Sequence, residues 1–309
     1  ITPLLDPTTH TYLALASDLD ASNLSYSRAL LGYTLSIYNK DILQAFDGLG
    51  HTISHLKINT DDDQLVVTLH YAGLFGLIDN VKTTTYLANI GLSDVDIHGV
   101  DFAGGLIAKS GNVSISGVWT TGNVSANRSK SSGGIGGVVG LNSSTNFVLQ
   151  NSFSSAIIHD EQNTSDGSVL SGVGVGGLVG LVSPRGGSAK IANCYSSGFV
   201  YGSDSQANYA GLVNTLFTVA IKNSFSTTVV MGPANNSGFL NYDHNYSSPT
   251  VSNSFWDINT SGVSVSALGQ GKTTSELQSM TILNNLGSAW SMKDGQYPYL
   301  KYLFPNGMQ

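Results

Sequence analysis

Charged side chains are scarce in this sequence. Asp, Glu, Lys and Arg make up 11% of its 309 residues, whereas soluble domains ordinarily devote about a quarter of their residues to these types. Ser, Thr, Asn and Gly must therefore cover most of the surface. The formal net charge is −7 and no run of Lys or Arg occurs. Because a nucleic-acid-binding face needs clustered basic side chains, the composition argues against nucleic acid as a partner.

Cysteine and long apolar runs are also lacking. Cys194 is the single cysteine of the chain, so an intramolecular disulfide cannot form. Secreted surface proteins without disulfides are common in bacteria and less common in animals. No uninterrupted apolar stretch has the roughly 20 residues that a membrane-spanning helix needs. The start, ITPLLDPTTH, has neither an initiator Met nor a charged n-region, which predicts an excised or processed fragment.

Glycine is abundant and recurs in a pattern. Residues 171–180 read SGVGVGGLVG, which places valine and leucine between glycines as a flexible linker would not. The same pattern returns about every 30 residues, which is the signature of a repeat protein. The aligned glycines of six copies are Gly73, Gly105, Gly137, Gly177, Gly211 and Gly238. The aligned large residues of the second element in each copy are Leu92, Trp119, Phe153, Tyr195, Phe225 and Phe255.

Each copy holds two or three short segments rich in Val, Ile, Leu and aromatics, which is strand composition. So few strands cannot bury their own apolar face, but stacked copies can. We therefore expect an all-β fold: one elongated parallel β-solenoid, or β-helix, with almost no helix before residue 270. The solenoid should be right-handed, because parallel crossover connections are generally right-handed. Leu178, Phe153, Tyr195 and Phe225 are expected to fill the stacked interior.

Asparagine precedes the aligned large residue in five copies, and Gly117 stands there in the sixth. Both residue types tolerate the left-handed backbone of a tight corner. Stacked asparagines could also bond along a ladder, and the sequence leaves the corner role and the ladder role equally open. The asparagines are Asn89, Asn151, Asn193, Asn223 and Asn253.

The units AGGLIA, IGGVVGLN and VGGLVGLV, each followed by a segment such as NSFS or NCYSSG, resemble the GLUG repeat of bacterial surface proteins. The lead-in FDGLGHTISHLKI (46–58) and the exit SFWDINTSG (254–262) resemble the flanks of those repeats. This ordering is similar to that of secreted filamentous-haemagglutinin-like adhesins of the two-partner secretion type. The resemblance implies a secreted, extracellular module at the bacterial cell surface and an outer-membrane secretion partner for the parent protein.

Three regions are expected. Residues 1–70 should cap the solenoid and form its first rungs, and residues 71–265 should be the repeats. Residues 266–309 should be a C-terminal cap and lead-out, with a short helix in 273–286 covering the last rung. The segment 297–304 is expected to be extended and to lead to the next module.

The best candidate for catalysis is a pair of acids, Asp94 and Asp96, whose two-residue spacing predicts that they point the same way. His98 and Asp101 lie nearby in the sequence. Paired carboxylates could bind calcium or act as acid and base in a polysaccharide lyase or glycoside hydrolase. The neighbouring copies offer only hydroxyls at comparable places, so exposed strand-end acids are the favoured interpretation. Those hydroxyls belong to Thr120, Ser154 and Ser196.

Other motifs are weak. The run DDD (61–63) lacks the ligand spacing of a calcium loop and is expected to be a solvated turn. His51 and His55 lie too far apart along a strand to be good zinc ligands, and Cys194 aligns with serines as a small core or turn residue. The GVGVGG stretch (172–177) has no helix pattern after it, which argues against a nucleotide site. Asn-x-Ser/Thr sequons occur, such as those at Asn112, Asn123 and Asn163, as expected by chance in a sequence rich in Asn, Ser and Thr. They matter only if the protein is secreted by a pathway that glycosylates it.

The predicted function is therefore a non-catalytic, monomeric solenoid that serves as an adhesive module or a rigid stalk. No catalytic, metal or cofactor site is expected, and no membrane insertion. The expected ligand is a host cell-surface glycan or protein, bound by the loops 125–134, 159–171 and 201–208. The alternative is a glycan-cleaving β-helix enzyme, which would need a groove that groups at least two acids with a basic residue.

Overall fold

The structure is a computed structural model. It describes residues 11–32, 43–62, 71–78, 83–100, 102–127, 133–144, 146–161, 173–183, 188–242 and 248–304.

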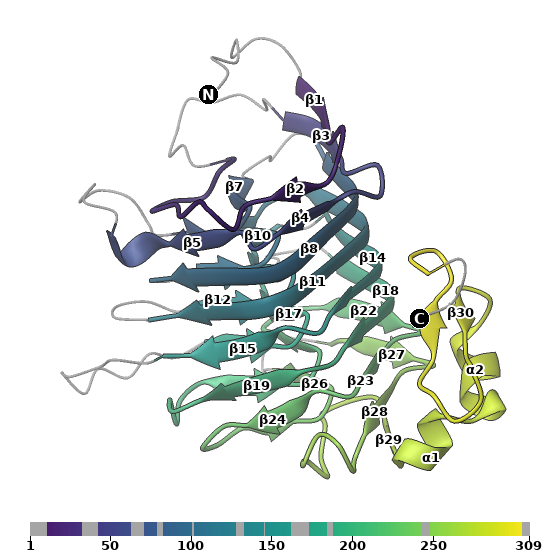
Figure 1. Ribbon diagram of the computed structural model, residues 1–309. Helices are drawn as coiled ribbons and strands as arrows, with labels where there is room; N and C mark the ends of the chain where they lie inside the picture. The colour runs from purple at the N-terminus through teal and green to yellow at the C-terminus, as the bar shows by residue number, and fades with distance from the viewer. Residues whose placement is uncertain are drawn as a thin grey trace.

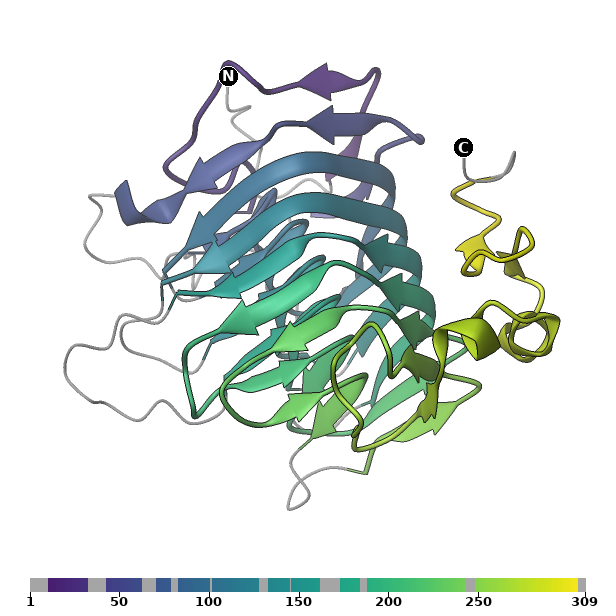
Figure 2. The same ribbon diagram turned by 60° about the horizontal axis from the view of Figure 1, so that its bottom comes forward.

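Strands stacked in parallel form almost the whole body of the protein (Figure 1), as predicted. Among the described residues the largest sheet holds 17 strands, and two further parallel sheets hold 6 each. Figure 2 shows successive turns of the chain lying one above the other. The predicted parallel β-helix is confirmed.

The large sheet consists of β1 (Thr11–Ala14), β2 (Leu19–Asp20), β3 (Leu43–Asp47), β4 (Thr52–Ser54), β5 (Lys57–Asn59), β8 (Thr85–Gly99), β11 (Val113–Ala126), β14 (Asn146–Ser154), β15 (Ile157–Asp160), β18 (Ser188–Ser196), β19 (Phe199–Gly202), β22 (Val219–Lys222), β23 (Phe225–Ser226), β24 (Val229–Met231), β27 (Thr250–Ser252), β28 (Phe255–Asp257) and β29 (Gln270–Lys272). The second sheet consists of β7 (Phe75–Ile78), β10 (Ile107–Ser110), β13 (Val139–Asn142), β17 (Val179–Val182), β21 (Val213–Thr215) and β26 (Leu240–Tyr242). The third consists of β6 (Tyr71–Ala72), β9 (Phe102–Gly104), β12 (Gly134–Gly136), β16 (Gly174–Gly176), β20 (Asn208–Ala210) and β25 (Asn236–Ser237).

One rung passes through all three sheets in chain order, for example through β12, β13, β14 and β15. Each strand pairs with the equivalent strand of the next rung, so that Ile107 lies beside Val139 and Val139 beside Val179. The interior of the solenoid, which we call the bore, is filled by aliphatic side chains from every rung. Leu178 is fully buried there, as the repeat predicted.

The repeated glycines stack on one another at the corner between the second and third sheets. A methyl group added to Gly177 would lie 2.1 Å from the carbonyl oxygen of Gly211, and one added to Gly211 would lie 2.1 Å from that of Gly238. These contacts are too short for any side chain. Glycine therefore recurs because the rungs approach each other here without room for a Cβ.

The asparagines serve both of the roles that the sequence left open. Asn151, Asn193, Asn223 and Asn253 all have φ between 46° and 51°, which is the left-handed conformation of a tight corner. The Asn193 side-chain amide also donates to the Asn151 carbonyl oxygen at 3.1 Å, and that of Asn253 donates to Asn223 at 3.2 Å. The corner residues thus form a hydrogen-bonded ladder along the solenoid.

The aromatic residues lie outside the bore, which corrects the expectation for Phe153, Tyr195 and Phe225. After the corner at Asn193, side chains alternate, so Cys194 points into the bore and Tyr195 points out. Phe153, Tyr195 and Phe225 are buried in a second apolar cluster, separate from the core. We call Trp119, Phe153, Tyr195, Phe225 and Phe255 the aromatic column. Leu92 is not part of it, because Gly91 is the residue that pairs with Trp119.

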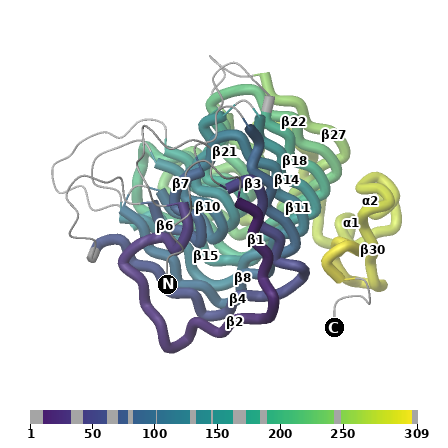
Figure 3. The backbone as a smooth tube through the Cα atoms, turned by 90° about the horizontal axis from the view of Figure 1, so that it is seen from above, coloured from purple at the N-terminus to yellow at the C-terminus, as the bar shows by residue number. Residues whose placement is uncertain are grey.

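The aromatic column is covered by the C-terminal arm, residues 273–304. The arm contains α1 (Thr274–Leu277), α2 (Met280–Leu286) and the antiparallel pair β30 (Trp290–Ser291) and β31 (Tyr299–Leu300). Thr273 and Glu276 form the predicted capping box. The arm stands beside the stack in Figures 1 and 3, and not over the last rung. The prediction that a helix covers the last rung was therefore wrong. Residues 297–304 lie against the solenoid through Tyr297 and Phe304, and their role as a lead-out to a next module stays a prediction.

The last rung is closed instead by residues 263–272. Ala267 donates its N–H to the carbonyl oxygen of Leu240 at 3.1 Å, and Gly238 donates to Val265 at 2.9 Å. These bonds cover part of the edge formed by β25, β26 and the turn between them, which would otherwise be open to pairing.

Candidate functional site

A groove of about 650 Å³ runs between the aromatic column and the C-terminal arm. The rings of its floor are stacked nearly parallel: those of Phe153 and Tyr195 are 4.6 Å apart at 6°, and those of Tyr195 and Phe225 are 5.2 Å apart at 4°. Tyr297 and Phe304 of the arm line the opposite wall. The groove is a consequence of the repeat, because each rung contributes one ring at the same register.

Hydroxyl groups run beside the rings. Thr121, Ser155, Ser197 and Thr227 line the groove, one from each successive rung. Each ring covers the face of the next, so ring edges and hydroxyls are what the groove presents. Burial raises the pKa of the Tyr195 hydroxyl above its ordinary range. Burial and, secondarily, the hydrogen bond to Asp257 raise the pKa of Tyr297 to about 12, so both phenols stay neutral.

Among the described residues that line this groove there is no Asp or Glu, and Lys293 is the one basic residue. Acid–base cleavage of a glycosidic bond needs two carboxyl groups that flank the bond. The described lining residues of the groove therefore offer no pair of carboxyl groups for such a hydrolysis.

A second candidate lies on the outward side of β5, β8, β11, β15, β19 and β24, which we call the outer face. In the register of these strands, Asn59, His98, Ser125, His159, Tyr201 and Met231 form one column. Lys57, Asp96, Asn123, Ile157, Phe199 and Val229 form the parallel column. The inward residues between the columns, such as Ile97 and Val200, are fully buried.

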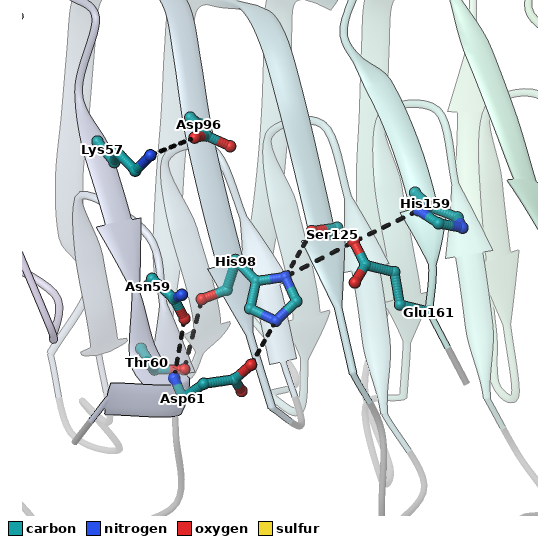
Figure 4. Close-up of polar contacts among 9 residues, drawn as sticks. All are labelled: Lys57, Asn59, Thr60, Asp61, Asp96, His98, Ser125, His159 and Glu161. Atoms are coloured by element: carbon teal, nitrogen blue, oxygen red, sulfur yellow. Dashed lines mark hydrogen bonds and ion pairs between the residues drawn. The ribbon is translucent and has the colours of Figure 1, made fainter. Parts of the chain in front are cut away.

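Asp61, His98 and Ser125 form a continuous polar chain on this face (Figure 4). The His98 imidazole lies 2.9 Å from the Asp61 carboxylate through Nε2 and 2.8 Å from the Ser125 Oγ through Nδ1. Glu161 lies 3.7 Å from His98 and 3.4 Å from His159. An acid, an imidazole and a hydroxyl in contact are the groups of a serine nucleophile.

In the described part of the chain, the surroundings of Ser125 offer no evident oxyanion hole, which such a site also needs. Ser125 pairs with both His98 and His159 in the parallel ladder, so the strand's backbone groups are committed to its neighbours. An oxyanion hole needs donors aimed at the developing charge. The carboxylate of Glu161, which lies 3.7 Å from His98 Nδ1, would also repel an oxyanion.

The predicted acid pair is not brought together. Strand β8 carries one extra residue relative to β11 between Leu92 and Val95, and Asp94 lies in this bulge with a φ of 51°. The simple alternation that predicted a shared direction therefore fails there. Asp94 donates its N–H to the Thr121 Oγ at 2.8 Å, whereas Asp96 pairs with Lys57 at 3.3 Å. Asp101 lies outside the described residues.

The aligned hydroxyls of Thr120, Ser154 and Ser196 are fully buried. Of the DDD run, Asp61 and Asp62 belong to a short 3-10 helix, Thr60–Asp62. The Asp61 side chain is 40% exposed and contacts His98, which agrees with the predicted solvated turn. Asp63 lies outside the described residues.

The two histidines considered above as zinc ligands have separate partners. His51 lies 3.2 Å from Asp18, and His55 lies 2.9 Å from Asp20. No group of three or more His, Cys, Asp or Glu side chains in the described part of the chain could hold a metal ion.

Cys194 is fully buried, and burial raises the pKa of its thiol to about 12, so it is a core residue and no nucleophile. Gly174 and Gly176 of the GVGVGG stretch belong to β16 and Gly177 to the corner after it, whereas Gly172 lies outside the described residues. Asn112 is buried and Asn123 is exposed, and Asn163 lies outside the described residues. No described helix is long and apolar enough to cross a membrane.

Two features escaped the sequence reasoning: the groove, which needs the arm to fold back, and the polar chain through His98. A signal for the second existed, because His98 and Ser125 share a register position once the bulge in β8 is allowed for.

Comparisons with known proteins support the fold. No family model matches the chain, and no curated protein matches it. The crystal structure of a putative immunoglobulin A1 protease from Bacteroides ovatus is similar, with a TM-score of 0.63 and 17% sequence identity. The match covers 97% of this chain and 88% of that one. At this identity the similarity shows the shared β-solenoid architecture.

Proposed function

We propose that this chain is a non-catalytic β-solenoid module of a secreted bacterial surface adhesin, serving cell adhesion or as a rigid stalk. The observation that carries the proposal is the content of the groove: ring edges and hydroxyls line it, and no carboxylate does among the described residues. The rungs are closed at the last turn and their strands are paired, so the solenoid offers side-chain surfaces and loops for contact. The GLUG-like repeats support the placement at a cell surface.

The test is adhesion. Beads coated with the protein should bind host cells or one class of glycan on an array, and uncoated beads should not. Trimming the loops 125–134, 159–171 and 201–208 should lower binding if they carry contacts. Half of the first loop and most of the second lie outside the described residues. Absence of binding by the intact chain would leave only the stalk role. Release of reducing ends or unsaturated products from anionic polysaccharides would instead support the glycan-cleaving alternative.

A second candidate function, hydrolysis of an ester or peptide bond, rests on the contacts of Asp61, His98 and Ser125. The similar solved structure is described as a putative protease, which gives a reason to test it. In such a step the Ser125 Oγ would attack the carbonyl carbon while His98 took its proton. His98 would return that proton to the leaving group, and water would release the acyl group.

A fluorophosphonate probe decides between the two. Labelling of Ser125 that disappears in Ser125→Ala and His98→Gln, but not in Ser114→Ala, would support hydrolysis. An unlabelled wild-type protein would remove this candidate and leave the non-catalytic proposal standing.

A further inference from the structure

We propose that the outer face is a docking surface for a protein segment that presents apolar side chains next to Lys or Arg. The inference rests on the proposed function, because it names the partner and the surface by which an adhesive module would bind.

The C-terminal half of the outer face is an exposed apolar patch. Phe199 is 43% exposed, Met231 53% and Ile157 38%. Ile157, Phe199 and Val229 pair in successive strands, and so do His159, Tyr201 and Met231. Side chains at paired positions are direct neighbours, so these residues form one contiguous patch. Phe, Tyr and Met are among the residue types enriched at protein–protein interfaces.

The N-terminal half of the same face is acidic, and Glu161, directly after β15, adds a carboxylate where this half meets the apolar patch. Asp96 is 53% exposed, Asp61 40% and Glu161 39%. Lys57 is the one Lys or Arg that the described part of this face carries, and it is paired with Asp96. A partner that approaches the patch therefore meets a negative potential, which attracts a basic group and disfavours an acidic one.

Two histidines hold the carboxylates in place. His98 contacts both Asp61 and Glu161, and His159 contacts Glu161 (Figure 4). His159 is itself stacked on Tyr201, with ring centroids 4.1 Å apart, so it joins the acidic half to the apolar half. Side chains fixed before binding lose little conformational entropy on binding.

The chemistry of the patch favours a protein segment over a sugar. Ile157, Val229 and Met231 carry no hydrogen-bond donor, whereas a sugar's hydroxyls need polar partners when they are desolvated. The ring of Tyr201 has one face covered by His159. Apolar side chains can enter this surface without leaving unsatisfied polar groups.

The test uses two synthetic peptides of about ten residues, each long enough in extended form to cross several strands. Both have one half of Leu and Phe, and the other half is lysine in the first and glutamate in the second. Fluorescence anisotropy should show binding of the lysine peptide only. Equal binding of both, or of neither, would overturn the proposal.

Matched variants locate the site. The double variant Phe199→Ser/Met231→Ser should weaken binding of the lysine peptide by about tenfold or more. Tyr86→Ser, at a ring that is 57% exposed elsewhere on β8, should leave it unchanged. Asp61→Asn/Glu161→Gln should also weaken binding and reduce its dependence on salt. Circular dichroism melts should first show that each variant is folded. Unchanged affinity in the serine double variant would overturn the assignment.

Two further measurements separate other outcomes. Sedimentation of the wild type as a dimer that the serine double variant dissociates would identify a second copy as the occupant, which contradicts a foreign segment. If the lysine peptide binds as expected but coated beads bind no cells, the docking surface stands and the adhesin proposal fails. If beads bind cells equally with the wild type and the serine double variant, adhesion stands and the outer face is not its site.

Discussion

Tyr302 of the C-terminal arm occupies the one place where the asparagine ladder is interrupted, at Gly117. A Cβ on Gly117 would lie 2.5 Å from the Tyr302 ring, and the Tyr302 hydroxyl donates to the Asn89 side chain in the rung above. Glycine stands in place of asparagine in this copy because the Tyr302 ring occupies the space that a side chain at position 117 would fill. The exception in the repeat therefore marks where the C-terminal arm contacts the solenoid.

Gly117→Asn should complete the ladder and release the end of the arm. The left-handed φ of 68° at this position suits asparagine, but its Cβ displaces Tyr302. We expect faster hydrogen exchange and proteolysis in residues 297–304. The global stability should change by less than about 1 kcal/mol, because Tyr302 is 57% exposed. Tyr302→Ala should act in the same direction, and unchanged exchange in both variants would show that the contact does not hold the arm.

Phe225→Ala should lower the free energy of unfolding by about 3–5 kcal/mol. Phe225 is 1% exposed and lies between Tyr195 and the arm residues Trp290 and Tyr297. Denaturant unfolding measures the loss. Phe199→Ala is the matched control, because Phe199 is 43% exposed on the outer face, and it should cost much less. A Phe225→Ala protein as stable as this control would show that the aromatic cluster contributes little.

The sequence predicts the solenoid because the glycine contacts and the buried aliphatics recur in every rung. It does not predict on which side of the sheet the aromatic column lies, since Cys194 and Tyr195 are both apolar and only alternation from the Asn193 corner tells them apart. The surface on which the C-terminal arm packs is even harder to predict from the sequence. Leu277, an apolar residue of α1, would pack equally well on a last rung or on a side wall.

The outer-face cluster depends on register across rungs of unequal length. Asp61, His98 and Ser125 are 37 and 27 positions apart, and the bulge at Asp94 shifts the alignment of β8 against β11 by one residue. A fixed repeat length cannot anticipate such a shift. The groove needs both the column and the returning arm, so it appears only in three dimensions.

Gly177→Ala should destabilise the protein strongly, by about 3 kcal/mol. Its new methyl group would lie 2.1 Å from a backbone oxygen of the next rung, which cannot move without breaking the ladder. Gly295→Ala is the control, because its φ of 67° strains a side chain but nothing lies within 4 Å. That change should cost only about 1 kcal/mol. Similar melting temperatures for the two variants would mean that the rungs can separate to admit a methyl group.

Acid should loosen the N-terminal edge of the solenoid through Asp18. Its carboxylate accepts the Thr52 N–H at 2.9 Å and contacts His51, and these bonds lower its pKa from the ordinary value of 3.8. Because the folded-state pKa is the lower one, the stabilisation is fully present above pH 3.8 and is lost as the pH falls through the folded value. Hydrogen exchange at Thr52, corrected for its intrinsic pH dependence, should therefore lose protection at low pH. Asp18→Asn should show the same reduced protection at every pH, and an acid response identical to that of the wild type would assign the effect to another group.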